Sequence, residues 1–280
     1  MAAVLGTNIA SIYASRNLQS AQNNLAASVE RLSSGIRINR SKDDAAGLAV
    51  SNFLSQQING ANQGIRNLND GVSLVQTADG ALATVNEMAQ RILTLAVQAS
   101  SDFLSSEQVT NIGAEMSNLT AEIMNIQART VMNDTVLFDD ASLSIQSSKE
   151  SGDTIEITAA ALDDFSSSTT YTNLDTAITN LVSGDAGVTG GLLVAAAEAY
   201  ITAIGTQRST LGALQNQMDY AITNITQLSA DLTSARSRVI DTDYASETAL
   251  LTKGQILQQA ATAMLAQANQ MPNVILSLLK

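Results

Sequence analysis

The sequence of 280 residues contains no cysteine and no histidine. Their absence excludes disulfides, thiol nucleophiles, histidine bases and every metal site built from cysteine or histidine. Aromatic residues make up only 3%, tryptophan is missing, and Pro272 is the single proline. Ala, Leu, Ser, Thr, Asn and Gln dominate instead, as in long helices that pack closely through small side chains. The composition therefore predicts a mainly helical chain that is not an enzyme and binds no cofactor or metal.

Acidic residues outnumber basic ones, and the excess is confined to the middle of the chain. The net charge is −12. Residues 102–198 carry fifteen acidic residues against Arg129 and Lys149, whereas the rest of the chain has a balance of +1. The middle of the chain should therefore be solvated. Because there is no basic patch, we expect neither nucleic acid nor an anionic membrane as the main partner.

Both ends of the chain are free of charge over residues 2–15 and 254–279. The second stretch is long enough to span a bilayer, but Gln and Asn side chains interrupt it repeatedly. A membrane span does not carry so many amides, so we expect no membrane insertion. Residues 1–20 also lack the basic start and apolar block of a secretory signal. The uncharged ends are predicted to be amphipathic segments that bind a protein partner.

Two stretches place apolar residues alternately three and four positions apart. This spacing favours helices that wind around one another with knobs-into-holes packing. Each helix would reach roughly 60–70 Å, so we expect a rod of two long antiparallel helices. Gln207 interrupts the second stretch, either as a register device or as a tolerated polar residue. The predicted rod seam consists of Leu54, Ile58, Ile65, Leu68, Leu211, Leu214, Met218, Ile225, Leu228 and Leu232.

The terminal segments carry weaker apolar stripes of the same kind. One thin rod cannot bury these stripes, so we predict that they contact other copies of the chain; the alternative is that they pair only with each other in a monomer. A lone terminal helix is close to energetic balance, which favours ends that are disordered before assembly. The predicted subunit-interface residues are Leu25, Val29, Leu32, Leu257, Met264, Leu265 and Leu278.

The middle of the chain should close the distal end of the rod. A helix is expected over 106–128, and alternation at 143–145 and 154–157 around Gly152 predicts a β-hairpin. Ser41 and Asp44 are predicted to form a capping box before the first rod helix. The fold is therefore a long antiparallel coiled-coil-like bundle with paired terminal helices. Its expected domains are 1–44 with 240–280, and 45–239 with an exposed loop around 140–191.

Several motifs occur at both ends of the chain in an order typical of one family. The chain resembles bacterial flagellin, the flagellar filament subunit, over nearly its whole length. The residues that carry the resemblance are Asn8-Ile9-Ala10-Ser11, Leu32-Ser33-Ser34-Gly35, Asp43-Asp44-Ala45-Ala46-Gly47-Leu48-Ala49, Asn69-Asp70-Gly71, Leu211-Gly212-Ala213, Ser234-Ala235-Arg236-Ser237-Arg238, Gln255-Ile256-Leu257-Gln258-Gln259-Ala260 and Leu265-Ala266-Gln267-Ala268-Asn269-Gln270.

The resemblance implies a subunit that polymerises with itself into the filament, the propeller for swimming. It also implies that the chain is exported unfolded by the type III apparatus with the help of an export chaperone. The chain would then assemble beneath a cap, contact hook-junction proteins, and have a secreted, extracellular location. The terminal helices would form the inner core of the filament. The short middle region resembles a compact family member without large outer domains.

Three other functions compete with this one. A flagellin with a zinc-peptidase insert needs two histidines around a glutamate, and this chain has no histidine. The nearer alternative is a hook–filament junction protein, which resembles flagellin at both ends. A surface coat protein or adhesin is a third class. The strong match through the last 70 residues favours flagellin proper.

The resemblance also implies a surface for the host Toll-like receptor that recognises flagellin. Its matching residues here are Gln90, Arg91, Leu95 and Glu122. The sequence departs from many family members at Leu93 and Thr94, where a basic and an acidic residue are common. A solvated arginine without a receptor role is the alternative for Arg91.

Overall fold

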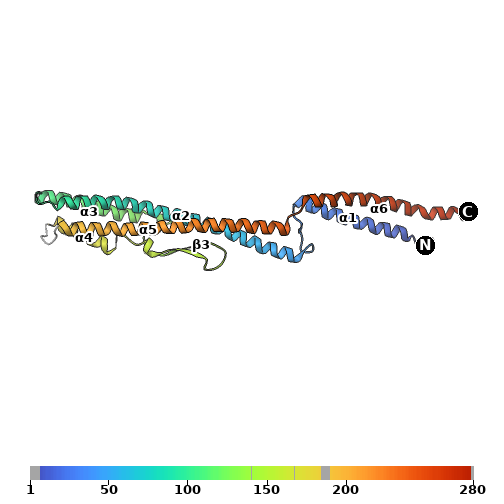
Figure 1. The fold of residues 1–280 in the computed structure, drawn as a ribbon, viewed down its shortest axis with the longest axis horizontal. Helices are drawn as coiled ribbons and strands as arrows, with labels where there is room; N and C mark the ends of the chain where they lie inside the picture. Colours follow the sequence, from blue (N-terminus) through green and yellow to red (C-terminus); the bar gives the residue numbers. More distant parts are fainter. Residues whose placement is uncertain (1–6, 140, 167, 184–189, 279–280) are drawn as a thin grey trace. The chain divides into compact units, whose positions relative to one another are not determined.

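The computed structural model describes residues 7–139, 141–166, 168–183 and 190–278, except for the side chains of 190 and 272–278. The described part is mainly helical (Figure 1). Its helices are α1 (Ile9–Ser34), α2 (Ala45–Ala99), α3 (Ser106–Arg129), α4 (Thr169–Val182), α5 (Gly190–Ile240) and α6 (Tyr244–Leu278). The chain divides into two compact units, Met1–Ile58 with Ala230–Lys280, and Asn59–Ser229. We call these the terminal unit and the middle unit.

Local signals in the sequence explain where the helices begin and end. The Asn8 side chain caps α1 by accepting from Ser11 N, and Gly35 ends the helix in the left-handed conformation at φ 71°. Ser105 and Gln108 form a reciprocal capping box at the start of α3. The prediction for α2 was wrong in detail: the helix begins at Ala45, and Asp44 is its cap. The Asp44 carboxylate accepts from Gly47 N at 2.9 Å, one helical turn later than the predicted Ser41.

The terminal unit is organised around the antiparallel pair α1 and α6, which run side by side (Figure 1). At one end, Thr242 N donates to the Gly35 carbonyl at 2.9 Å, and Ile36 forms a bridge with Asp241. At the other end, Asn8 Nδ2 donates to the Ala268 carbonyl at 2.7 Å. The interruption expected around Asp241 is therefore the connection between α5 and α6, and it also joins α6 to the residues that follow α1.

The middle unit contains a continuous apolar core built from α2, α3, α4 and α5 together with residues between 137 and 165 that lie outside these helices. Two aromatic pairs lie in it, Phe138 with Phe165 at 4.8 Å and Tyr171 with Tyr200 at 5.8 Å between ring centroids, both edge-on. The largest fully buried side chains of the core are Tyr200, Phe138, Phe165, Leu68, Leu82, Ile92, Met116, Ile123, Ile157, Leu162, Leu174 and Ile178.

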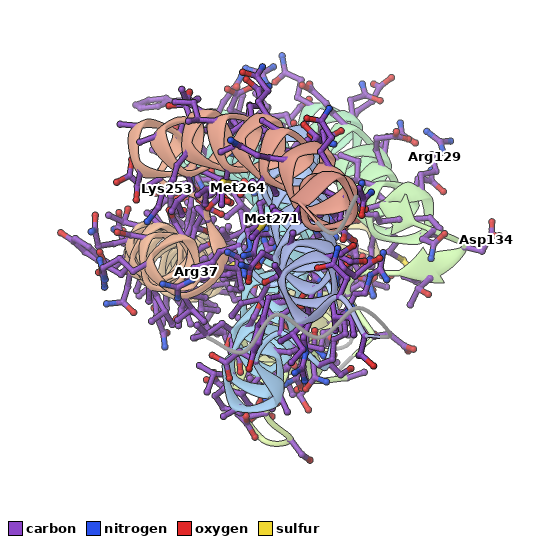
Figure 2. The ribbon with its side chains drawn as sticks, turned by 90° about the vertical axis from the view of Figure 1, so that its right-hand side faces the viewer. Arg37, Arg129, Asp134, Lys253, Met264 and Met271 are labelled. Carbon is purple, nitrogen blue, oxygen red and sulfur yellow. The ribbon has the colours of Figure 1, made fainter. Side chains whose placement is uncertain are left out.

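Two small antiparallel ribbons accompany these helices. The predicted hairpin is present as β3 (Leu143–Gln146) and β4 (Thr154–Ile157), with Leu143 opposite Ile157. A second ribbon, β1 (Val131–Met132) with β2 (Thr135–Val136), was not predicted. Its turn residues Asn133 and Asp134 have φ of 52° and 62°, and Asp134 points away from the helices (Figure 2). Asn and Asp between short apolar pairs are a recognisable signal for such a tight turn.

Candidate assembly interface

Small side chains form the contact between α1 and α6. Buried residues on α1 follow one another at intervals of seven, and α6 has a matching row. Because these side chains are short, the two helices approach closely and bury little apolar surface against each other. The buried row on α1 is Ala14, Ala21 and Ser28, and the row on α6 is Gly254, Ala261 and Ala268. We call these two rows the small-residue seam.

An ion pair and a hydrogen bond flank the small-residue seam. Near its Gly35 end, Arg31 Nη1 lies 3.8 Å from Glu247 Oε2, and Glu247 is only 6% exposed. Near the opposite end, Ser11 Oγ donates to Asn269 Oδ1 at 2.9 Å. These polar contacts fix the register of the pair but add little apolar burial.

The large apolar side chains of both helices lie outside the small-residue seam. Tyr13 is 63% exposed, Ile256 60%, Met264 62% and Met271 56%. Isolated exposed apolar residues are ordinary, but a row of them along paired helices indicates a surface that another protein covers. The other exposed members are Ile9, Ile12, Val29, Leu250 and Leu257. We call this set the exposed apolar face.

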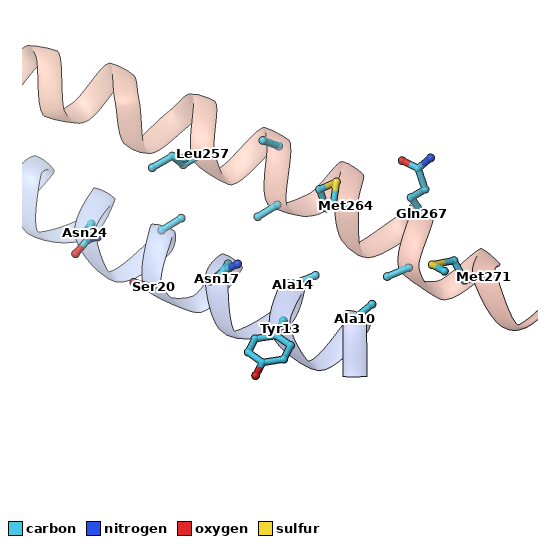
Figure 3. A pocket seen from close by; sticks show the side chains of 14 residues that line it. Ala10, Tyr13, Ala14, Asn17, Ser20, Asn24, Leu257, Met264, Gln267 and Met271 are labelled. Carbon is cyan, nitrogen blue, oxygen red and sulfur yellow. The ribbon is translucent and has the colours of Figure 1, made fainter. Parts of the chain in front are cut away.

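Part of the exposed apolar face lines a groove of about 860 Å³ between α1 and α6. Tyr13 and Ala14 contribute from α1, and Leu257, Met264 and Met271 contribute from α6 (Figure 3). A second groove, of about 600 Å³, runs along α1 past Leu25 and Val29. Arg40 Nη2 lies 2.8 Å from Glu30 Oε1 at its edge.

The structure places the predicted interface residues in three groups. Val29, Leu257 and Met264 are exposed, whereas Leu25, Leu32 and Leu265 are half-buried beside the small-residue seam. The side chain of Leu278 lies outside the described residues. Sequence reasoning did not name Tyr13 and Ile256 as interface residues, although both lie in or next to the uncharged stretches that pointed to these helices.

Most residues of the predicted rod seam lie inward in their own unit. Five of them are buried: Leu68, Leu211, Leu214, Met218 and Ile225. Leu54, Ile58, Ile65 and Leu232 are half-buried, and Leu228 is 49% exposed.

Two polar residues accompany the seam in the middle unit. Gln207 is buried, and its Nε2 donates to the Asp163 carbonyl at 3.0 Å. At the next residue, Arg208 Nε donates to Asp79 Oδ1 at 2.8 Å, which joins α5 to α2. This hydrogen bond raises the pKa of the Arg208 guanidinium. Both contacts tie α5 to its surroundings at one position and so favour one helix register.

The residues matched to the receptor surface do not share one environment. The Arg91 guanidinium donates twice to Glu115 Oε1, at 2.7 and 3.0 Å, which joins α2 to α3. Gln90 is exposed and Glu122 pairs with Arg129 at 3.1 Å. Leu95 is 2% exposed and belongs to the core, so it does not lie on the surface.

Two tyrosines in the middle unit have altered acidity. Burial, with Tyr171 and Asp164 nearby, raises the pKa of Tyr200 far above its usual value. Burial and Asp175 also raise the pKa of Tyr171, whose hydroxyl donates to the Thr120 carbonyl at 3.1 Å. Among the described residues, no group of three or more acidic side chains is arranged to hold a metal ion, and no helix has the length and apolarity of a membrane span.

Two paired helices that bury small residues and expose large ones are typical of a helical subunit that contacts other protein chains. Residues 5–142 match the family described as the bacterial flagellin N-terminal helical region, and residues 194–279 match the bacterial flagellin C-terminal helical region. The chain belongs to the bacterial flagellin family. It is therefore a structural subunit of the flagellar filament, which lies outside the cell, and not an enzyme.

Individual relatives match almost from end to end. Flagellin of Halalkalibacterium halodurans is 37% identical over 290 residues, covering 99% of this chain and 100% of that protein. Flagellin of Bacillus subtilis strain 168 is 34% identical over 304 residues, covering 98% of each. The crystal structure of Bacillus cereus flagellin aligns with a TM-score of 0.49 and 26% identity, over 61% of this chain and 94% of that one. The family match and the two flagellin relatives favour the filament subunit over a hook–filament junction protein.

Proposed function

We propose that the exposed apolar face of α1 and α6 is the surface through which the subunit polymerises, and that further copies of this chain occupy the groove between these helices. The observation that carries the proposal is the arrangement of the two helices, with small side chains inside and large apolar ones outside. A filament built from copies of one chain provides a cover for such a face without any other partner.

The energetics favour folding that is coupled to assembly. Ordering one residue opposes folding by about 1–2 kcal/mol of backbone entropy, and fully burying a Leu or Met side chain contributes about 1.5–3 kcal/mol. Within one subunit, α1 and α6 bury mainly Ala, Ser and Gly against each other. Most of the favourable apolar burial therefore requires contact with neighbouring subunits. The terminal helices should consequently be largely unfolded before assembly.

The remaining partners follow from the same surface. An unfolded terminal segment suits export through the type III apparatus, and an export chaperone would cover the apolar side chains before secretion. The cap and the hook-junction proteins would meet the same face at the two ends of the filament. In this arrangement 1–44 and 240–280 form the inner core and 45–239 the outer rod, with the exposed acidic side chains in the described part of 102–198 facing solvent.

A pair of matched substitutions tests the interface. Leu257 on the exposed apolar face is 47% exposed, and Leu192, near the start of α5 in the middle unit, is 58% exposed. Leu257→Ser should raise the critical concentration for polymerisation about tenfold or more, since burial of one Leu is worth about 1.5–3 kcal/mol. Leu192→Ser should leave it unchanged. Sedimentation and electron microscopy measure both, and equal behaviour of the two variants would refute the interface.

We further propose the host Toll-like receptor for flagellin as a partner at Gln90, Arg91 and Glu122. The support is an exposed patch across α2 and α3 in which Glu115 holds the Arg91 guanidinium at the surface. Arg91→Ala should lower receptor signalling by monomeric protein, whereas Arg66→Ala, elsewhere on α2, should not. Full signalling by Arg91→Ala would remove Arg91 from the receptor surface.

A further inference from the structure

Three of the described methionines are exposed, and two of them share the groove between α1 and α6. Met264 and Met271 are seven residues apart on α6 and are 62% and 56% exposed. Met124 on α3 is 51% exposed and lies in the middle unit. In contrast, Met116 and Met218 are fully buried. Two thioethers are thus accessible within the surface assigned above to subunit contacts (Figure 2, Figure 3).

We propose that Met264 and Met271 form a peroxide-sensitive modification site that controls whether a subunit can enter the filament. The inference rests on the proposed function, because it requires the groove to be filled by another copy. In the free subunit both sulfurs are open to small oxidants. In the filament the same side chains are covered and protected.

The chemistry needs only hydrogen peroxide as co-reactant. A lone pair of the thioether sulfur attacks one peroxide oxygen, an S–O bond forms and the O–O bond breaks. The departing oxygen takes up the proton of the transferred hydroxyl and leaves as water. Sulfur is oxidised by two electrons and peroxide is reduced, which leaves methionine sulfoxide at the site. Methionine sulfoxide reductases reverse the reaction with electrons from thiols.

The consequence follows from the composition of the groove. A sulfoxide oxygen is a strong hydrogen-bond acceptor, and the groove is lined largely by apolar groups, including those of Ala14, Ala261 and Leu257. Its polar lining residues are Asn17, Ser20, Asn24 and Gln267. Burying a polar acceptor without a donor is unfavourable, whereas a thioether in the same place is not. Each sulfoxide should therefore weaken subunit addition by about tenfold.

The chain offers a matched control for this effect. Met124 is exposed to a similar extent, so peroxide should oxidise it at a similar rate in the monomer. It lies on α3 in the middle unit, whereas the exposed apolar face belongs to the terminal unit. Oxidation of Met124 should leave assembly unchanged. Leucine replaces methionine with nearly the same volume and cannot be oxidised in this way, so it suits both sites.

The experiment compares the wild-type chain, the double variant M264L/M271L and the variant M124L. Monomers are treated with hydrogen peroxide, sulfoxides are counted by mass spectrometry, and the critical concentration is then measured. We expect a rise of tenfold or more for the wild type and M124L, none for M264L/M271L, and recovery after treatment with both sulfoxide reductases and dithiothreitol. Normal assembly of wild-type chains oxidised at both residues would overturn the proposal, as would equal inhibition of M264L/M271L.

Peroxide treatment of finished filaments separates this inference from the proposed interface. If copies fill the groove, Met264 and Met271 should oxidise at least tenfold more slowly in filaments than in monomers. Protection together with normal assembly of oxidised chains would refute the modification site alone. Oxidation at the monomer rate would refute the interface itself, and with it the site.

Discussion

Substitution of Gly64 by alanine should dislodge the β3–β4 hairpin from α2. A Cβ atom at Gly64 would lie 1.7 Å from the Ser147 carbonyl oxygen and 2.5 Å from its carbonyl carbon. Both are backbone atoms, so no side chain can rotate away to make room. An ordinary carbon–oxygen contact requires about 1.5 Å of additional separation. The hairpin must therefore move away from the helix, or the helix must bend.

The size of the effect can be estimated from the contacts that depend on this approach. Asn67 Nδ2 donates to the Gln146 carbonyl at 3.0 Å, and loss of that hydrogen bond costs about 0.5–1.5 kcal/mol. Overpacking strain adds about 1–3 kcal/mol. Against this, alanine is favoured over glycine within a helix by about 1 kcal/mol. We therefore expect Gly64→Ala to lower the free energy of unfolding by about 1–3 kcal/mol.

Gly80 on the same helix provides the control. A Cβ there would meet nothing within 4 Å, so Gly80→Ala should stabilise the protein by about 1 kcal/mol. Urea unfolding followed by circular dichroism gives both values, and amide exchange of Ile145 and Ile155 reports on the hairpin directly. If Gly64→Ala proved as stable as Gly80→Ala, with unchanged hairpin protection, the reasoning from close backbone approach would be wrong.

Three further experiments probe other contacts. Tyr200→Phe should leave stability at pH 7 unchanged or slightly higher, because the buried hydroxyl has no hydrogen-bond partner. Since the folded-state pKa of Tyr200 is raised, the wild type should lose stability as the pH rises above about 10, the pKa of the unfolded state. The variant should show a shallower loss of stability in urea titrations at about pH 9–11. A double-mutant cycle of Arg208→Ala and Asp79→Ala should give a coupling energy of only about 0.2–1 kcal/mol, because both side chains are more than a third exposed, and a coupling above about 2 kcal/mol would contradict this. Ser105→Ala should destabilise α3 by about 1 kcal/mol through loss of the capping box, whereas Ser106→Ala should not, as thermal unfolding would show.

Much of the helical structure is readable from the sequence. The periods of three and four residues around Leu68 and Leu211 predict helices that the structure contains as α2 and α5, and the alternation near Ile145 and Ile155 predicts β3 and β4. These signals are strong because one face of each element is buried, so the apolar period repeats the geometry of the element.

Other features cannot be predicted from sequence patterns, because they depend on contacts between segments that are distant in the sequence. Gly64 looks like an ordinary helix-weakening residue until the Ser147 carbonyl is found against it. Leu228 continues the heptad spacing of α5 yet is 49% exposed, because spacing records which residues are apolar and not what lies opposite them. Leu95 shows the reverse case, since a motif match placed it on a surface and packing places it in the core.

The terminal helices show most clearly why the spacing of apolar residues alone does not predict which residues form an interface. Ala14 and Ala21 on α1 and Ala261 on α6 satisfy a heptad as well as leucine would, and a periodicity search weights them less because alanine is only weakly hydrophobic. Yet it is this weak row that the chain buries against itself, which leaves the stronger row outside. Small residues are buried within the subunit, and large ones are buried only between subunits. The isolated helix pair is therefore marginally stable, and the polymer is favoured. Because folding of the pair is coupled to assembly, substitutions in the small-residue seam should weaken addition of subunits through the pairing of α1 with α6, whereas substitutions on the exposed apolar face should weaken it through the contacts between subunits.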